Sequence, residues 1–385
     1  MSLYQRMQEQ LDKKRHDSCF RFLRSSRQTD CYISTDNRQY INLSSNDYLG
    51  IGHDKALVRD FIDSSRSESD FYFSSSSSRL LTGSYMCFEE FEQYIGSLYN
   101  KKALYFNSGF DANSGVLQTL GSADTLILAD KKSHASIIDG MALSSGKTLR
   151  FKHNDVEHLK ALIERYKDEY ESIIIVTEAL FSMDGDIAPL EKIAALKDVY
   201  DNIYIYVDEA HSFFVYGQGL GLCYEKKVLS KIDFVLVTLG KGFGSAGAVL
   251  MCSDVCKDYL INTMRPFIFT TALPPVNILY SLFILKKSDI FAKRRDRLAQ
   301  ISTYIRSVIH SKGLNCPSDS HIIPIILGSN DNAIKAASLF EEHGFLAMPV
   351  RHPTVPVGQA RLRLSLCSFL SDDDIEKLST LILRL

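Results

Sequence analysis

The sequence predicts an α/β fold, with a large domain built on a mostly parallel central sheet and a smaller α+β domain at the C-terminal end. Several apolar runs of strand length are continuous rather than alternating, which is typical of strands buried on both faces of a sheet. These runs are SIIIVT (172–177), IYIYV (203–207), FVLV (234–237) and AVLMC (248–252). Helical patterns alternate with them, as in a parallel sheet. The 385 residues, 45% of them hydrophobic, can fill more than one core.

The N-terminal part, residues 1–45, is expected to be a helical and extended segment. Its first residues, MSLYQRMQEQLDKKRH, are polar, follow a helical pattern and lack the apolar core of a signal peptide. The large domain is expected over residues 46–275. The serine run 74–78 near its start predicts a packed loop, because apolar residues follow it at once, and a disordered linker is the alternative.

Helix and strand patterns then alternate through the large domain. Phe88, Phe91, Ile95 and Leu98 have helical spacing. Strands are predicted at 103–107 and 125–129, and helices within 108–120, 133–143 and 154–170. The pattern changes after about residue 275, and residues 276–385 are expected to form the smaller α+β domain. There we expect a long helical stretch (276–312), strands at 321–327 and 361–366, and helices at 332–343 and 372–384.

The composition excludes several classes of function. The formal charge of −2 gives no basic footprint for nucleic acid, and no apolar run approaches the roughly 20 residues that span a membrane. The eight cysteines are scattered, and Cys252 and Cys256 lack the spacing of a zinc or redox pair. We therefore expect a cytoplasmic protein without a bound metal.

Two short motifs resemble parts of ATPases. GMALSSGKT (140–148) has five residues between its glycines where a phosphate-binding loop needs four, and a helix pattern precedes it where a strand is required. DEAH (208–211) matches a helicase motif, but a helicase also needs a phosphate-binding loop, and residues 140–148 do not match one. The sequence therefore argues against an ATPase.

Small, polar or titratable residues follow five predicted strands. Ligands bind beyond the carboxyl ends of strands in an open parallel sheet, so these residues are candidates for one site. They include Ser108-Gly109-Phe110, Asp130 and His134, Ser182, Asp208 to His211, and Thr238 to Lys241.

Each candidate has a functional and a structural interpretation. The free N–H groups of Gly109 and Phe110 at a helix start suit a phosphate, but an ordinary helix cap is equally consistent. The ring of His134 could stack on a flat ligand, or it could lie on the surface. Asp208 at the end of a buried strand needs a positive partner, from a ligand or from an internal Lys or Arg. His211 could donate to a nearby oxygen, or it could be a cap or a metal ligand, although no second histidine or cysteine has the spacing of a metal ligand.

Lys241 lies in TLGKGFGSAG (238–247), where glycines leave it open to a ligand. Partial burial and a cationic neighbour lower the pKa of an amine, which makes its neutral, nucleophilic form available. A nucleophilic lysine, a buried carboxylate, an aromatic ring and a phosphate cradle together match the needs of pyridoxal 5'-phosphate.

These motifs resemble those of the α-oxoamine synthases, a family of fold type I pyridoxal-phosphate enzymes. The resemblance covers nearly the whole chain. Its motifs are NLSSNDYLG (42–50), SRLLTGS (78–84), NSGFDAN (107–113), SHASIIDG (133–140), EALFSMDGDIAPL (178–190), VDEAH (207–211), TLGKGFG (238–244) and RHPTVPVGQARLRLSL (351–366).

The resemblance implies a role for each matched residue. Lys241 would bind the cofactor covalently and act as the acid–base group, Asp208 would hold the proton on the ring nitrogen, and His134 would stack on the ring. His211 would bond the phenolate oxygen of the ring. Further cofactor contacts are implied for Gly109, Phe110, Ser182 and Thr238, and, from the neighbouring subunit of a homodimer, for Thr270 or Thr271.

The resemblance also implies a substrate side made of Arg21, Asn46, His134, Arg351, Thr354 and Arg363. Arg361 and Arg363 would share one face of a strand, and a guanidinium group suits the carboxylate of an amino acid, with a salt bridge as the alternative. The substrates implied are L-alanine and a pimeloyl thioester of coenzyme A or acyl carrier protein.

Other members of the family remain alternatives, namely the glycine C-acetyltransferase, 5-aminolevulinate synthase and serine palmitoyltransferase types. A non-catalytic scaffold relative is a further alternative, although such subunits typically lose the lysine that this chain keeps. The chain departs from the family pattern at the serine run 74–78 and at Ser212, Phe213 and Phe214, and neither departure touches Lys241, Asp208 or His134.

Overall fold

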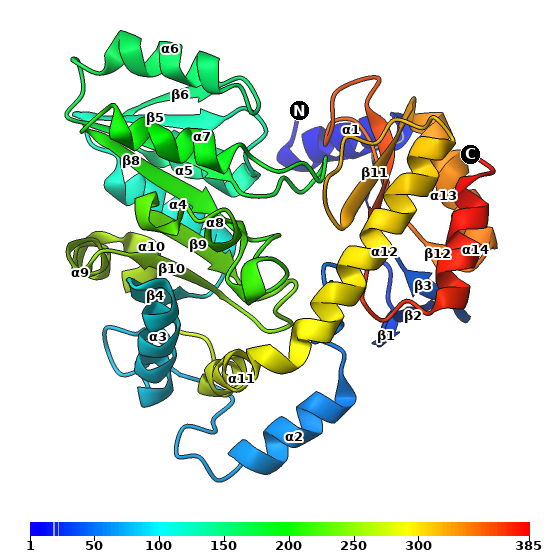
Figure 1. Cartoon of the computed structure of the whole chain (residues 1–385), viewed down its shortest axis with the longest axis horizontal. Helices are drawn as coiled ribbons and strands as arrows, with labels where there is room; N and C mark the ends of the chain where they lie inside the picture. Colours follow the sequence, from blue (N-terminus) through cyan, green and yellow to red (C-terminus); the bar gives the residue numbers. More distant parts are fainter. Residues whose placement is uncertain (18–19, 22) are drawn as a thin grey trace. The chain divides into compact units, whose positions relative to one another are not determined.

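The computed structural model describes residues 1–17, 20–21 and 23–385, which form two compact units (Figure 1). Unit 1 consists of residues 1–45, 183–185 and 298–385, and unit 2 of residues 46–182 and 186–297. Among the helices of the described ranges, none is long and apolar enough to cross a membrane.

Unit 2 is built on a sheet that, in the described residues, has seven strands. Their order is β4 (Lys102–Phe106), β10 (Ala248–Cys252), β9 (Phe234–Thr238), β8 (Ile203–Asp208), β7 (Ser172–Glu178), β5 (Thr125–Asp130) and β6 (Lys147–Phe151). Strand β10 runs antiparallel to both of its neighbours, and the pairs from β9 to β6 are parallel. The predicted fold class, α/β with a mostly parallel sheet, is confirmed.

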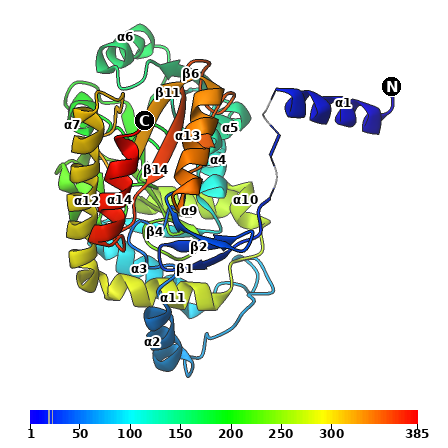
Figure 2. The ribbon, with the colours of Figure 1, turned by 90° about the vertical axis from the view of Figure 1, so that its right-hand side faces the viewer.

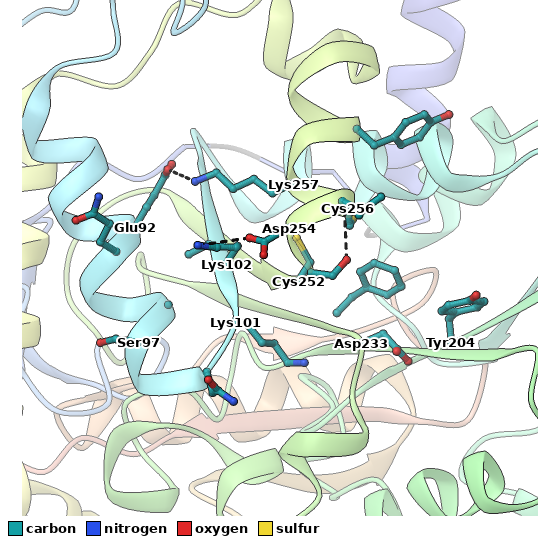
Figure 3. Close-up of a pocket in the computed structure, with 18 of the residues that line it drawn as sticks. Glu92, Ser97, Lys101, Lys102, Tyr204, Asp233, Cys252, Asp254, Cys256 and Lys257 are labelled. Atoms are coloured by element: carbon teal, nitrogen blue, oxygen red, sulfur yellow. Dashed lines mark hydrogen bonds and ion pairs between the residues drawn. The ribbon is translucent and has the colours of Figure 1, made fainter.

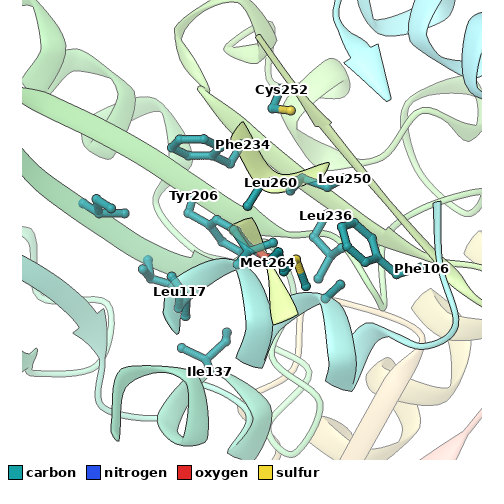
Figure 4. Packing of buried hydrophobic residues seen from close by; sticks show 14 of the residues in the cluster. Phe106, Leu117, Ile137, Tyr206, Phe234, Leu236, Leu250, Cys252, Leu260 and Met264 are labelled. Atoms are coloured by element: carbon teal, nitrogen blue, oxygen red, sulfur yellow. The ribbon is translucent and has the colours of Figure 1, made fainter. Parts of the chain in front are cut away.

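Helices cover this sheet, and in Figure 1 its strands pass in front of α4 (Gly109–Leu120) and α5 (Ala135–Leu143). Leu117 and Ile137 of these helices pack with Leu236 of β9 and Leu250 of β10 in one buried apolar cluster (Figure 4). The other helices of unit 2 are α2 (Lys55–Ser65), α3 (Met86–Tyr99), α6 (Val156–Tyr166), α7 (Leu190–Ala194), α8 (Leu222–Glu225), α9 (Asp254–Thr263), α10 (Arg265–Ile268) and α11 (Pro275–Lys286).

Unit 1 contains two smaller sheets. The first has the order β1 (Arg27–Thr29), β2 (Tyr32–Thr35), β3 (Arg38–Asn42) and β12 (Phe345–Leu346), and the second has the order β11 (Ile322–Gly328), β14 (Ala360–Ser365) and β13 (Pro349–Val350). Because β12 pairs in parallel with β3, the N-terminal strands share a sheet with the C-terminal part of the chain. Helix α13 (Asn330–Glu342) packs against β11, β12 and β14, and Figure 2 shows it beside β11 and β14. Other helices of this unit are α1 (Leu3–His16), α14 (Asp372–Ile382) and most of α12 (Ala292–Ser311).

Two details differ from expectation or refine it. The long helical stretch predicted over 276–312 is present as two helices, α11 and α12 (Ala292–Ser311), with a 3₁₀ turn at Ser288–Phe291 between them. Serine and aspartate at 288 and 289 can bond to nearby backbone and so favour such a break. The serine run is the packed loop that was predicted, since Ser75 is buried and its Oγ donates to the carbonyl oxygen of Ala272 at 2.6 Å.

The cysteines of the described residues all carry free thiols. Five of them, at positions 31, 87, 223, 252 and 367, are buried, as expected for small apolar groups. Cys19 lies outside the described residues.

Candidate active site

A cavity of about 310 Å³ opens at the carboxyl ends of the parallel strands of unit 2. Its size falls within the range of ligand pockets, roughly 300–1,000 Å³. The cavity brings together eight of the residues that the sequence singled out, from five separate segments: Asn46, Gly109, Phe110, His134, Asp208, His211, Thr238 and Lys241.

The first turn of α4 forms one wall of the cavity. Ser108 caps the helix, its Oγ accepting from the backbone N–H of Asp111 at 3.1 Å, and the N–H groups at Gly109 and Phe110 begin the helix. A Cβ atom on Gly109 would lie 2.5 Å from Cγ2 of Thr238, so a larger residue at this position requires Thr238 or the helix turn to move. The N–H groups and the positive end of the helix dipole make this turn a suitable phosphate site.

Asp208 ends β8 with only 4% of its surface exposed. Its Oδ1 accepts from the backbone N–H of Ala210 at 2.8 Å, and its Oδ2 accepts from Nδ2 of Asn113 at 2.7 Å. No ion pair to Asp208 forms within the part of the chain that the structure describes, so the alternative of an internal Lys or Arg partner fails. A buried carboxylate without a cation favours a positive group from a ligand in the cavity.

Lys241 begins a chain of hydrogen bonds through unit 2. Its Nζ lies 2.7 Å from Nε2 of His211, and Nδ1 of His211 lies 2.6 Å from the hydroxyl of Tyr48. Tyr48 donates in turn to Oδ1 of Asn46 at 3.0 Å. Since the hydroxyl proton of Tyr48 goes to Asn46, His211 donates from Nδ1 and accepts at Nε2 from the amine. These hydrogen bonds orient the Lys241 amine and hold His211 in one tautomer.

His134 and Glu178 line the cavity on its other side. The backbone N–H of His134 donates to Oε1 of Glu178 at 2.6 Å. Burial, together with the charge of Lys241, lowers the pKa of His134, although Asp208 opposes this shift. Burial and the charge of Asp208 raise the pKa of Glu178 to about 8. At neutral pH the imidazole is therefore neutral and Glu178 is largely protonated.

These side chains fit pyridoxal phosphate. The buried carboxylate of Asp208 would hold a protonated ring nitrogen, and the helix turn at Gly109 and Phe110 would hold the phosphate. The amine of Lys241 would bind the aldehyde, with His211 beside it. A flat aromatic face is available from His134.

The family of aminotransferase class I and II matches residues 38–382. The chain belongs to this family. It is a pyridoxal-phosphate-dependent enzyme of the α-oxoamine synthase type, as the sequence motifs predicted.

Two similar relatives within this family carry the same name. A protein of Glaesserella parasuis is 44% identical over 339 residues, which are 87% of this chain and 88% of the relative, and one of Neisseria meningitidis serogroup C is 42% identical over 90% of this chain and 91% of the relative. Both are named "Putative 8-amino-7-oxononanoate synthase".

Solved structures share the fold. The serine palmitoyltransferase of Sphingomonas wittichii superimposes with a TM-score of 0.91 at 26% identity, covering 100% of this chain and 98% of that one. The 8-amino-7-oxononanoate synthase of Francisella tularensis gives a TM-score of 0.72 at 30% identity, covering 90% and 97%.

Some predicted cofactor residues of this aminotransferase-family chain lie outside the cavity lining. Ser182 follows β7 and is half-buried. Thr270 lies instead in a small hollow of about 20 Å³ beside Arg79 and Asp111. The carbonyl oxygen of Thr271 accepts from Nδ2 of Asn107 at 2.7 Å.

The predicted substrate residues Arg21, Arg351, Thr354 and Arg363 belong to unit 1. There Nη2 of Arg21 donates to Oγ1 of Thr354 at 3.2 Å, so the structure brings these two together. Arg363 is half-buried and donates from Nη1 to Oγ of Ser365 at 2.6 Å. Arg361 is buried instead in an ion pair with Asp184.

The motifs contained four residues of the site, three of them in the cavity lining, that sequence reasoning did not single out. They are Tyr48, which orients His211; Asn113, which bonds Asp208; and Ser136 and Glu178, which contact His134. Asn113 follows Gly109 by four residues and so lies on the same helix face, which is a spacing that could have identified it.

A larger hollow of about 980 Å³ lies elsewhere in unit 2, and Figure 3 shows the side chains around it. It opens at Lys102 and Phe234, the first residues of β4 and β9. It therefore lies at the amino ends of these strands, whereas Asp208 lies at the carboxyl end of β8. Two of its cations are paired, Lys257 with Glu92 at 2.8 Å and Lys102 with Asp254 at 3.4 Å. It lies at the amino ends of the strands, whereas ligands of open parallel sheets bind beyond the carboxyl ends, where the smaller cavity opens.

Proposed function

We propose that the protein joins L-alanine to a pimeloyl thioester and releases carbon dioxide, the free thiol and 8-amino-7-oxononanoate, a step of biotin synthesis. The observation that carries this proposal is the 42–44% identity, over 87–90% of the chain, to proteins bearing that enzyme name. The cavity supports it because it holds the acid–base amine and the buried carboxylate that the chemistry needs.

When bound, pyridoxal phosphate draws electron density away from the α-carbon of the amino acid. The residues of the chain prepare this chemistry. Asp208 keeps a proton on the ring nitrogen, because a buried carboxylate is stabilised by an adjacent positive charge. Nζ of Lys241 accepts the proton from the α-carbon of alanine and later returns a proton to the product. His211 would bond the phenolate oxygen of the ring by donating from Nε2 when that nitrogen carries a proton, while Nδ1 stays bonded to Tyr48.

The remaining predicted roles belong to the same proposal. Arg363 binds the carboxylate of alanine, since its guanidinium fork suits two oxygens. Arg21, Asn46, Arg351 and Thr354 line the substrate side, while Ser182 and Thr238 hold the cofactor. In a homodimer, Thr270 or Thr271 contacts the phosphate bound to the partner subunit. The acyl carrier is coenzyme A or acyl carrier protein, and we place the reaction in the cytoplasm.

The test is product analysis with paired substrates. Purified protein loaded with pyridoxal phosphate is incubated with L-alanine and pimeloyl-coenzyme A, and the product is identified by mass. We expect 8-amino-7-oxononanoate, and none from Lys241→Ala. A product from other pairs but not from this one would overturn the proposal.

A second candidate is favoured by the TM-score of 0.91 to a serine palmitoyltransferase. L-serine with palmitoyl-coenzyme A is therefore a required arm of the same experiment, with glycine and acetyl- or succinyl-coenzyme A as further arms. The identity of that structure to this chain is 26%, against 44% for the first relative, so we expect alanine with the pimeloyl thioester to be the productive pair.

A further inference from the structure

Asn113 connects two sides of the candidate active site. It lies in α4 with 2% of its surface exposed, too deep to contact a substrate freely. Its Nδ2 donates one hydrogen to Oδ2 of Asp208 at 2.7 Å and the other to Oγ of Ser136 at 3.0 Å. A single amide group therefore bonds the carboxylate and the segment that carries His134.

Tyr206 fixes the orientation of this amide. Its hydroxyl donates to Oδ1 of Asn113 at 2.8 Å, and burial raises the pKa of Tyr206 so that the phenol keeps its proton. A carboxylate can only accept, so the atom of Asn113 that faces Asp208 must be the nitrogen. Both neighbours impose the same orientation, and the flipped amide would oppose oxygen to oxygen at Asp208.

Ser136 connects the amide of Asn113 to the ring of His134 through hydrogen bonds. The backbone N–H of Ser136 points at Nδ1 of His134 at 3.3 Å, so that nitrogen carries no proton. Because Oγ of Ser136 receives the hydrogen of Asn113, its own proton is directed to the same Nδ1 at 2.8 Å. The imidazole is thereby held neutral, with its proton on Nε2.

We propose that Asn113 is a positioning residue that sets the carboxylate of Asp208 and, through Ser136, the tautomer of His134. The inference rests on the roles given to Asp208 and His134 in the proposed function. It adds that these two groups, which contact the cofactor ring, are aligned by one hydrogen-bond junction and not independently.

The two arms of the junction can be separated by mutation. Ser136→Ala removes the hydroxyl that joins Asn113 to His134 and leaves the bond from Asn113 to Asp208, and we expect the ¹⁵N signals of the His134 ring to change from the Nε2–H form to a mixture of tautomers. The measurement uses histidine-labelled protein loaded with pyridoxal phosphate, and the His134 signals are those missing from His134→Gln. Unchanged ring signals in Ser136→Ala would overturn the His134 arm.

Asn113→Ala removes both arms. A hydrogen bond to a charged group is worth enough that we expect the Kd for pyridoxal phosphate to rise about tenfold or more. Asn113→Asp keeps the volume but faces Asp208 with a second carboxylate, so its Kd should rise further. Tyr206→Phe leaves the amide unpinned and should raise the Kd about threefold.

The control is Asn202→Ala, since Asn202 also donates twice from Nδ2, to the carbonyl oxygens of Lys167 and Tyr170, away from the cavity. Its Kd should equal that of the parent. If Asn113→Asp and Tyr206→Phe fold and bind the cofactor as the parent does, the Asp208 arm is wrong. Neither readout uses alanine or a thioester, so a parent that binds the cofactor but makes no 8-amino-7-oxononanoate would contradict the proposed function alone.

Discussion

At the scale of single residues, two carboxyl groups stand opposite each other at the ends of neighbouring strands. The register of β7 and β8 pairs Glu178 with Asp208, and both side chains are 4% exposed. Burial and the nearby charge of Asp208 raise the pKa of Glu178 to about 8. Two buried negative charges on neighbouring strands repel each other, so one of the two carboxyl groups retains its proton. The site therefore contains a neutral acid beside a carboxylate.

This arrangement predicts a pH dependence of stability. The pKa of Glu178 rises from 4.5 to about 8 on folding, so its effect on stability is most favourable below pH 4.5 and is lost as the pH rises through 8. Glu178→Gln should remove that slope, which is at most about 1.4 kcal/mol per pH unit for one proton. The measurement is the free energy of unfolding in urea across this pH range.

The matched control for this prediction is Glu171→Gln, because Glu171 is exposed on the surface. Its pH profile should follow that of the parent. A Glu178→Gln profile that also runs parallel to the parent would show that Glu178 ionises normally.

At the scale of elements, the cofactor cradle depends on how closely α4 approaches β9. Because Gly109 at the start of α4 has no Cβ, Cγ2 of Thr238 at the end of β9 fits against the first helical turn. Gly109→Ala should push the helix turn away and raise the Kd for pyridoxal phosphate about tenfold, since the phosphate contacts depend on its N–H groups.

The conflict can be relieved from the other side. Thr238→Ser deletes Cγ2 and keeps the hydroxyl, and the next atom that a Cβ at position 109 would meet is Cβ of Thr238 at 3.8 Å. The double variant should therefore recover most of the affinity. Cofactor titration followed by absorbance measures it, and no recovery would mean that Gly109 is needed for a reason other than space.

A second contact between elements holds the loop after β7 near the end of β5. Nδ1 of His153 lies 2.9 Å from Asp130, the last residue of β5, and Nε2 lies 2.7 Å from Asp186. Burial opposes a charge on His153, but its hydrogen bonds to the two aspartates outweigh burial and raise its pKa to about 9. The charged imidazole is thus a link between strand and loop.

This link predicts a second pH effect, which belongs to the elements it joins. Because the pKa is raised from 6.5 to about 9, the stabilisation is complete below pH 6.5 and is lost as the pH rises through 9. The unfolding free energies of the parent and of His153→Gln should differ by about 3 kcal/mol at the acidic end and converge at the alkaline end. The exposed His16→Gln is the control, and a constant difference would contradict the prediction.

Apolar strand runs and strand-end residues were readable from the sequence, but pairing between distant elements was not. The runs at 172–177, 203–207 and 234–237 each correspond to a strand, since burial on both faces demands continuous apolar residues. Strands β1 to β3 are short and partly polar, and β3 is completed by β12 some 300 residues later, a partnership that no local pattern indicates. Asn113 and Tyr48 were missed for the same reason, because their partners Asp208 and His211 come from other segments.

At the scale of the whole molecule, unit 2 exposes large apolar side chains on two segments that are hydrogen-bonded to each other. Phe73, Leu81 and Phe269 are 75%, 79% and 72% exposed, and their segments are joined by the N–H of Ala272 donating to the carbonyl oxygen of Ser77 at 3.0 Å. Exposed apolar patches of this kind mark association surfaces. They support the homodimer of the proposed function.

We expect the protein to sediment at twice its chain mass of 43.4 kDa. Phe73→Glu combined with Leu81→Glu should shift it to the single-chain mass, because charged groups would have to be buried in the interface. Val255→Glu, at a side chain 79% exposed on α9, is the control and should leave the mass unchanged. A parent of single-chain mass would contradict the homodimer.

The place of β10 in the sheet has a consequence for synthesis on the ribosome. Among the described strands, β4 is bonded only to β10, which the chain supplies about 140 residues later. Until Ala248–Cys252 has emerged from the exit tunnel, β4 lacks its strand partner, and the turn at Ser108, Gly109 and Phe110 that follows it is not yet anchored to the sheet. Vitamin B6 capture should then come late in synthesis, after β10, the last strand of this sheet along the chain, has been made.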